Sequence, residues 1–234
     1  SNINYLSETL NSIINQSYKN IESIIYDDCS SNSTDIEKLI NSKKDDRISF
    51  FKSDINKGVS NSLNEIIKKT NGDFFCWCPD DDYMSLSRIE CQLRSIEKNP
   101  DFLSYCNHYQ IIEIFKLKRK IKHNFYLKFF DLYFYSIIFD RINGETLLIP
   151  LKIIKKYNFN SKLKHIQDYD VWHQIFHNNK SVHTKEYLFF SRKHSKQVSN
   201  LKINEAKNEI SDYYVNFIKK NLFSLIHYYG KKGF

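Results

Sequence analysis

Apolar residues recur along the first half of the chain in two alternating patterns, one typical of helices and one typical of strands. Spacing of three and four residues predicts helices at 3–14, from about Thr34, at 59–70 and from Ser87. Short apolar runs between them predict strands at 21–26, 48–51 and 74–78. Strands alternating with helices indicate βαβ units, and therefore an α/β fold with a mixed, mainly parallel sheet flanked by helices.

The pattern is less regular after residue 100. Apolar runs predict strands at 102–106, 110–115, 144–149 and 187–190. Pro150 suits the first turn of a helix, residues 171–176 lie on a further helix, and Ser87 with Glu90 forms a capping-box sequence. The tail from about 203 to 229 is helical and amphipathic. We therefore expect an α/β domain over 1–198 and a helical extension over 199–234 packed on it.

Composition excludes several classes of protein. With 41% hydrophobic and 15% aromatic residues in 234, the chain can bury a core and is not disordered. No apolar run approaches the roughly 20 residues that cross a bilayer. Five cysteines without C-x-x-C spacing indicate reduced thiols and a cytoplasmic location. The net charge of +8 favours anionic partners without pointing to nucleic acid.

Two acidic clusters follow predicted strands, at the edge where α/β sheets bind ligands. Asp27 and Asp28 follow the strand at 21–26, where helix capping is an equally good explanation. The run Asp80–Asp82 follows the strand at 74–78. Three adjacent carboxylates repel one another unless a cation lies between them. Because Mg²⁺ and Mn²⁺ take carboxylate and phosphate oxygens, a metal site and an exposed turn are the alternatives there.

Two further clusters lie in the second half. Asp168 and Asp170 stand at a predicted helix start, so one can cap the helix while the other faces a pocket. Two capping aspartates are the simpler alternative. The basic turn Ser191–His194 follows an aromatic strand and could meet a diphosphate or a metal ion.

Taken in order, these segments resemble family 2 glycosyltransferases of the GT-A fold. The resemblance covers about residues 2–198 and is carried by Tyr5–Ile13, Asn15–Glu22, Ile24–Ser30, Asn56–Ser60, Gly72–Phe74, the aspartate run and Leu163–Trp172. It implies a GT-A domain and an inverting transfer of a sugar from a nucleotide-diphospho-sugar, with a UDP-sugar favoured. The implied acceptor is a hydroxyl of a glycan or of a lipid-linked molecule in bacterial cell-surface polysaccharide synthesis.

The resemblance also implies roles for single residues. Asp168 is expected to be the general base that takes the proton of the acceptor hydroxyl. Two sets of binding residues are expected: Asp27, Asp28, Lys57 and Asp80 for the nucleotide sugar, and Asp81, Asp82 and His194 for Mg²⁺ or Mn²⁺. The metal would neutralise the leaving diphosphate.

Two departures from the family pattern support a different class of function. The family's first strand should precede Ser1, so the chain is expected to be trimmed, with an exposed sheet groove or an unpaired edge. Pro79 stands where the family's first metal-binding aspartate is usual. The alternative is a catalytically inactive glycosyltransferase-like binding protein.

Three other features suggest different partners. His173 and His177 have zinc-site spacing, but Gln174 stands where a zinc hydrolase needs glutamate, so we expect surface histidines. The basic run 116–122 is more typical of a solvated face than of a nucleic-acid site. Aromatic and aliphatic residues interleaved with lysines at 213–232 suggest either core packing or a helix at the inner membrane face.

Overall fold

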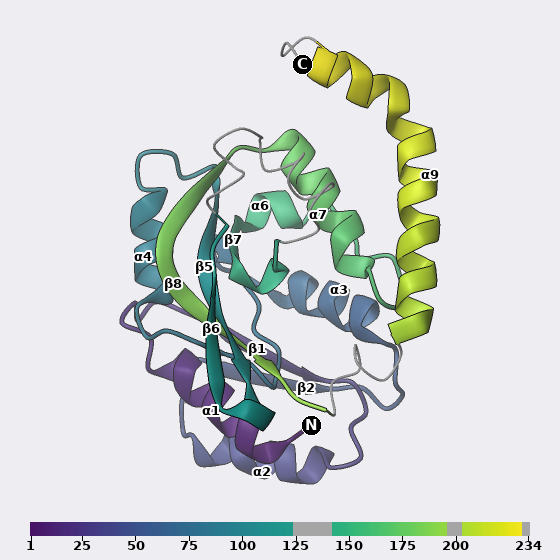
Figure 1. The fold of residues 1–234 in the computed structure, drawn as a ribbon. Coiled ribbons are helices and arrows are strands. Elements are labelled where there is room, and N and C mark those ends of the chain that lie inside the picture. The colour runs from purple at the N-terminus through teal and green to yellow at the C-terminus, as the bar shows by residue number, and fades with distance from the viewer. Residues whose placement is uncertain (124–141, 196–202, 231–234) are drawn as a thin grey trace.

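The computed structural model describes residues 1–123, 142–195 and 203–230, shown in Figure 1. Their elements in chain order are α1 (Ile3–Ile14), β1 (Ser23–Asp27), α2 (Ser33–Ser42), β2 (Ile48–Lys52), α3 (Val59–Lys69), β3 (Phe74–Phe75), β4 (Tyr83–Met84), α4 (Arg88–Ser95), β5 (Leu103–Ile112), η1 (Glu113–Phe115), β6 (Leu117–Ile121), η2 (Gly144–Thr146), β7 (Leu147–Pro150), α6 (Leu151–Ile154), α7 (Gln167–Asn178), β8 (Ser181–Lys193) and α9 (Ile203–Gly230).

The strands form two sheets. β1 and β2 pair in parallel, with Ser23 opposite Ile48. The larger sheet has the order β3-β7-β5-β8-β4, and β6 pairs with β5. Within it, β5 and β8 run in parallel and form the long curved spine seen in Figure 1, whereas the other described pairs are antiparallel. The fold is therefore mixed α/β, with parallel pairing confined to two of the described strand pairs.

Several predicted elements differ from the observed ones. The two strands expected at 102–106 and 110–115 form the single strand β5. The strand expected at 74–78 is regular over Phe74–Phe75 alone. The sequence predicted one sheet, but the strands expected at 21–26 and 74–78 belong, as β1 and β3, to different sheets. β3 is short because only Phe74 and Phe75 pair with β7. Pro79, which cannot donate a strand hydrogen bond, and the acidic loop follow soon after.

The capping box predicted at the start of α4 does not form. Ser87 is the N-cap residue, but its side chain makes no capping hydrogen bond, and its hydroxyl lies 3.3 Å from that of Ser85. Glu90 instead accepts hydrogen bonds from Ser17 at 2.6 Å and from Arg94 at 3.0 Å. The side-chain oxygen of Gln16, in the loop after α1, instead accepts a hydrogen bond of 3.2 Å from the backbone N–H of Ile89 in the first turn of α4.

The main core lies between the large sheet and the helices α3, α6 and α7. Its buried apolar residues include Leu63, Ile67, Phe75, Leu103, Leu147, Ile149, Ile154, Val171, Trp172, Ile175 and Phe176. A second cluster, with Leu6, Leu10, Ile36 and Ile40, joins α1 to α2. The predicted boundary at 198–199 lies outside the described residues. None of the described helices is long and apolar enough to cross a membrane.

Replacing Gly144 by alanine is expected to destabilise the fold. A Cβ atom at Gly144 would lie 2.4 Å from Nε1 of Trp172, and Trp172 is 2% exposed. Because a buried tryptophan cannot move away freely, we expect a loss of about 1–3 kcal/mol in the free energy of unfolding, measured with urea. Gly72→Ala is the matched control, since its Cβ would meet no atom closer than 3.7 Å. Equal stabilities of the two variants would contradict this packing.

Candidate active site

The acidic loop Asp80–Asp82 joins β3 to β4 and is held by both α1 and β8. The hydroxyl of Thr9 in α1 lies 3.1 Å from the carbonyl oxygen of Asp80 and 2.5 Å from that of Asp82. The backbone N–H of Arg192 in β8 donates a hydrogen bond of 2.7 Å to Oδ1 of Asp82. The loop therefore has a fixed position relative to both elements.

Asp82 is the buried member of this loop, with 3% of its surface exposed. Burial and, to a smaller extent, the neighbouring charge of Asp81 raise the pKa of Asp82 to about 7, although the backbone N–H of Arg192 opposes them. A carboxyl group that titrates near neutrality is a weaker partner for a cation than an ionised one. Its role as a metal ligand stays a prediction, and its surroundings favour a role in shaping the loop.

Asp81 and His194 face each other across the acidic loop and the end of β8. Oδ2 of Asp81 lies 3.1 Å from Nε2 of His194, and the ring of His194 packs against that of Tyr5 at 5.3 Å. A carboxylate oxygen and an imidazole nitrogen are both suitable ligands for Mn²⁺. The pair therefore fits the metal that the sequence implied.

The protein supplies few ligands for such a metal. Within residues 1–123, 142–195 and 203–230, no group of three or more His, Cys, Asp or Glu side chains is arranged to hold an ion. Mg²⁺ in nucleotide sites is commonly held by one or two carboxylates, with substrate phosphates and water completing the shell. A site of this kind binds the ion together with a diphosphate rather than alone.

Arg192 is buried, although the sequence suggested that its basic turn meets a ligand. Its guanidinium donates hydrogen bonds to the carbonyl oxygen of Asp81 and to the carboxylate of Glu8, and only 4% of its surface is exposed. Its Nε lies 3.6 Å from Glu113, and the group lies over the ring of Tyr5. Arg192 thus joins α1, the acidic loop and η1.

The N-terminus of α7 carries Asp168 and Asp170, but neither residue caps the helix. The N-cap residue is Ile166, without a side-chain hydrogen bond, so the capping predicted for the aspartates is wrong. Asp170 instead accepts a hydrogen bond from the hydroxyl of Tyr213 in α9 at 3.3 Å. Asp168 is in the first helical turn, where the helix dipole stabilises negative charge.

Glu145 interacts electrostatically with both Asp82 of the acidic loop and Asp168 of α7. The sequence did not identify it as a residue of the site. Burial raises the pKa of Glu145 well above its usual range, and the negative charges of Asp82 and Asp168 raise it further. Its backbone carbonyl accepts a hydrogen bond from the buried Arg88. A single glutamate in an apolar segment gives no signal in a sequence, because its neighbours come from distant parts of the chain.

Most of these groups, but not Asp170, line one cleft with a volume of about 1560 Å³. Its lining includes the predicted residues Asp80, Asp81, Asp82, Asp168 and His194, as well as Glu145 and Arg192. The structure thus brings together the residues predicted for the metal and the residue predicted as catalytic base. The arrangement can accept a divalent cation with a diphosphate and can take up a proton from a substrate.

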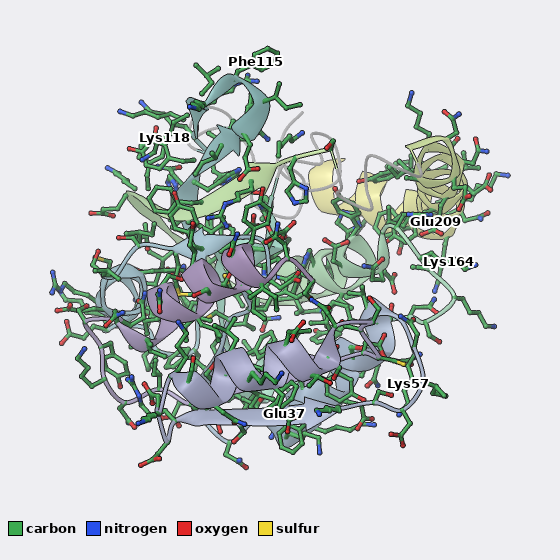
Figure 2. The ribbon with its side chains drawn as sticks, turned by 90° about the horizontal axis from the view of Figure 1, so that it is seen from below. Glu37, Lys57, Phe115, Lys118, Lys164 and Glu209 are labelled. Atoms are coloured by element: carbon green, nitrogen blue, oxygen red, sulfur yellow. The ribbon has the colours of Figure 1, made fainter. Side chains whose placement is uncertain are left out.

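Asp27, Asp28 and Lys57 do not line this cleft. The carboxylate of Asp28 accepts hydrogen bonds from the backbone N–H groups of Lys57 and Gly58, at 2.8 and 2.7 Å. Burial would raise the pKa of Asp27, but hydrogen bonds from Ser30 and Ser33 outweigh it and lower that pKa. Figure 2 shows Lys57 on the side of α2 and β2, away from Phe115 and Lys118. The nucleotide role of these residues stays a prediction.

Glu209 of α9 holds the segment that leads into α7. Its carboxylate accepts hydrogen bonds from the backbone N–H groups of Lys164, His165 and Ile166, at 3.0, 2.8 and 3.1 Å. Figure 2 shows Glu209 beside Lys164. Burial would raise the pKa of Glu209, but these amides outweigh it and hold the pKa below its usual value. A side chain from α9 thus replaces the missing local cap of α7.

Glu209→Gln is expected to loosen this connection. The amide side chain removes the charge from three hydrogen bonds, so we expect a loss of about 1–2 kcal/mol in the free energy of unfolding at pH 7. Because the folded pKa of Glu209 is lowered, its contribution is present above its unfolded pKa and disappears as pH falls through the folded pKa. Asp212→Asn, an exposed position on the same helix, is the matched control. Equal urea midpoints for both variants would contradict the assignment.

His173 is not a surface histidine, which corrects the expectation from the sequence. It is 1% exposed, its Nδ1 lies 3.2 Å from the hydroxyl of Tyr213, and its ring packs against Tyr214 and Phe217. His177, one turn further on α7, is exposed. His173 therefore helps to pack α9 on α7. The spacing of His173 and His177 gives no support for a zinc hydrolase.

Comparison with known proteins gives consistent matches. The family model described as glycosyl transferase family 2 matches residues 2–178. An uncharacterized glycosyltransferase of Rickettsia typhi is 31% identical over 93% of this chain and 68% of its own length. The Escherichia coli enzyme WfaP, a UDP-Glc:α-D-GlcNAc-diphosphoundecaprenol β-1,3-glucosyltransferase, is 31% identical over 61% of this chain and 58% of its own.

Among solved structures, a mannosyltransferase from Pyrobaculum calidifontis in complex with GDP-Man and Mn²⁺ has a similar fold. The TM-score is 0.66 at 12% identity, over 88% of this chain and 58% of that one. This likeness confirms the GT-A fold predicted from the sequence.

Proposed function

Because the chain belongs to glycosyltransferase family 2, we propose that it is an inverting, metal-dependent glycosyltransferase that acts in the synthesis of a bacterial cell-surface glycan. The observation that carries the proposal is the single cleft lined by Asp81, His194 and Asp168. In this proposal the cleft meets the two requirements of the reaction: Asp81 and His194 would hold a cation with a diphosphate, and Asp168 would serve as the base for the acceptor.

In the proposed reaction, an acceptor oxygen forms a bond to the anomeric carbon of the sugar while the bond to the diphosphate breaks. Asp168 takes the proton of the acceptor hydroxyl, and it lies in the first turn of α7, where the helix dipole favours negative charge. Asp81 and His194 would hold Mg²⁺ or Mn²⁺, which neutralises the charge of the leaving diphosphate when bound. A single displacement of this kind inverts the anomeric configuration.

Relatives support the proposed substrates. The E. coli relative is named for a UDP-sugar donor and a lipid-diphosphate acceptor, and the P. calidifontis structure holds GDP-Man with Mn²⁺. We propose a UDP-sugar donor, a glycan or lipid-linked acceptor and no nucleic acid. We also propose contact with the inner membrane face through α9, whose Leu222 and Phe223 are exposed.

A panel of nucleotide sugars, measured by thermal shift with Mn²⁺ and with EDTA, tests the proposal. A ligand that binds the folded chain raises Tm by mass action, so the donor should raise Tm with Mn²⁺ and much less with EDTA. His194→Ala should reduce the part of this Tm increase that depends on Mn²⁺. If no nucleotide sugar raises Tm, the proposal is wrong. If one binds and is never transferred, the inactive binding protein is the correct alternative.

A further inference from the structure

The hairpin of β5, η1 and β6 ends in an exposed apolar tip. The exposed fractions of Ile114, Phe115 and Leu117 are 74%, 75% and 54%. Figure 2 shows Phe115 at the far end of this hairpin, pointing away from the rest of the protein. Large apolar side chains gathered at one exposed point usually mark an interaction surface.

Basic side chains surround this tip. Lys116, Lys118, Arg119, Lys120 and Lys122 are all exposed, and the one acidic residue between 113 and 122 is Glu113. The carboxylate of Glu113 accepts a hydrogen bond from the hydroxyl of Tyr5 and lies 3.6 Å from Nε of Arg192, so its charge is compensated. The hairpin therefore presents apolar residues within a strongly positive surface.

The basic residues are distributed over both faces of β6. Nζ of Lys118 lies 3.7 Å from the ring centroid of Tyr109, and Nζ of Lys120 lies 5.4 Å from that of Tyr187. Arg119, between them in sequence, lines the cleft with Ile114. Positive charge thus flanks the apolar tip on both sides, as a flat anionic surface would require.

Strand pairing and side-chain contacts hold the hairpin in this position. β5 and β6 pair from His108 opposite Ile121 to Ile112 opposite Leu117, and Lys116 adopts φ of 48° in the turn. Contacts of Glu113 with Tyr5 of α1 and Arg192 of β8 hold the turn that carries the tip. Since the tip is ordered before binding, little conformational entropy is lost when it contacts a partner.

We propose that this hairpin is a membrane-binding element that inserts Ile114 and Phe115 between the headgroups of an anionic bilayer while its lysines and Arg119 contact lipid phosphates. Interfacial membrane binding combines apolar insertion with attraction to anionic lipid in this way. The tip is convex and has aliphatic as well as aromatic residues, which suits a lipid surface better than single-stranded nucleic acid, where exposed rings stack on bases.

The hairpin would bind the membrane together with α9, not instead of it. Figure 2 shows the hairpin and α9 both on the upper side of the molecule, opposite α2 and β2. Because Ile114 and Arg119 also line the cleft, contact at the hairpin places the lipid surface next to the candidate active site. This last consequence rests on the proposed function, whereas membrane binding itself does not.

Sedimentation with vesicles of phosphatidylcholine and phosphatidylglycerol tests the proposal without any measurement of transfer. The whole chain should bind these vesicles, bind pure phosphatidylcholine far less, and lose affinity in high salt. Ile114→Ser with Phe115→Ser should weaken binding by about tenfold or more, because two bulky apolar groups no longer insert. Lys118→Gln with Lys120→Gln should weaken it by about fivefold per charge.

Matched variants make the outcome decisive. Ile55→Ser with Leu86→Ser removes two other apolar residues, 64% and 54% exposed, and should leave vesicle binding unchanged. A Phe115→Trp variant should show a blue-shifted emission with anionic vesicles and quenching by brominated lipid, whereas Ile55→Trp should not. Unchanged binding by the hairpin variants, loss only on Leu222→Ser with Phe223→Ser, or hairpin-dependent binding of single-stranded oligonucleotides without vesicle binding would each overturn the proposal.

Discussion

Replacing Asp168 by asparagine is expected to lower the rate of sugar transfer by about 10²–10⁴-fold while leaving donor affinity nearly unchanged. Asparagine keeps the size of the side chain and much of its hydrogen bonding, but it cannot accept the proton of the acceptor hydroxyl. The loss should therefore appear in kcat. Transfer is measured as nucleotide release in the presence of acceptor, and donor affinity by calorimetry.

Asp170→Asn is the matched control, two residues away in the same helical turn. Its carboxylate accepts a hydrogen bond from Tyr213 rather than lining the cleft, so the variant should keep transfer and lose at most about 1 kcal/mol of stability. A wild-type rate for Asp168→Asn with a slow Asp170→Asn would reverse the assignment. Full activity of both variants would disprove the proposed mechanism.

Lowering the pH from 7 to 5 is expected to remove the stability that two buried histidines contribute, against the opposite contributions of Asp82 and Glu145, whose pKa values are raised. His108 and His123 are 6% and 1% exposed, and their ring centroids are 5.4 Å apart. Burial lowers the pKa of His108 to about 4. Burial is also the main reason why the pKa of His123 is lowered to about 3, and repulsion from His108 and His183 adds to it.

The direction of this stability change follows from the pKa of about 6.5 that both histidines have in the unfolded chain. Below that pH the unfolded chain binds protons at both histidines while the folded chain does not, so stability present above 6.5 disappears as pH falls toward 4. At pH 5 the loss is about 2 kcal/mol for each histidine and about 4 kcal/mol for both.

Urea unfolding at pH 7 and pH 5 measures this loss. Between pH 7 and pH 5, a variant with His108→Gln and His123→Phe should lose about 4 kcal/mol less stability than the wild type. His227→Gln, at an exposed position on α9, should change as the wild type does. The same pH dependence in all three proteins would show that these histidines are not the cause.

The residues of the cleft that follow regular elements could be predicted from the sequence. Asp80–Asp82 come after an apolar strand, and Asp168 begins a helix that is apolar at helical spacing. Such patterns are local and reflect burial of one face, so α1, α2, β2 and α9 were predicted near their observed positions. The ordered series of motifs then identified the family, which the match over residues 2–178 confirms.

Other parts of the site depend on contacts between distant segments, which no local pattern encodes. The basic turn Ser191–His194 was predicted as a possible ligand contact, but the ion pairs of Arg192 with Glu8 and Glu113 gave no sign in the sequence. Glu209 binds amides more than 40 positions earlier in the chain, and it replaces a cap that the sequence placed on the aspartates of α7. Because packing decides the partners of Arg192 and Glu209, no local sequence pattern distinguishes these two residues.

The anomeric configuration of the transferred sugar tests the central claim most directly. The donor that raises Tm with Mn²⁺ is incubated with the chain and an acceptor, and the product linkage is assigned by NMR from the coupling at the anomeric proton. We expect a transferred sugar whose anomeric configuration is opposite to that of the donor, because Asp168 activates the acceptor for a single displacement in the cleft that holds the diphosphate. A retained configuration, or a donor that stays intact although it is bound, would contradict this account.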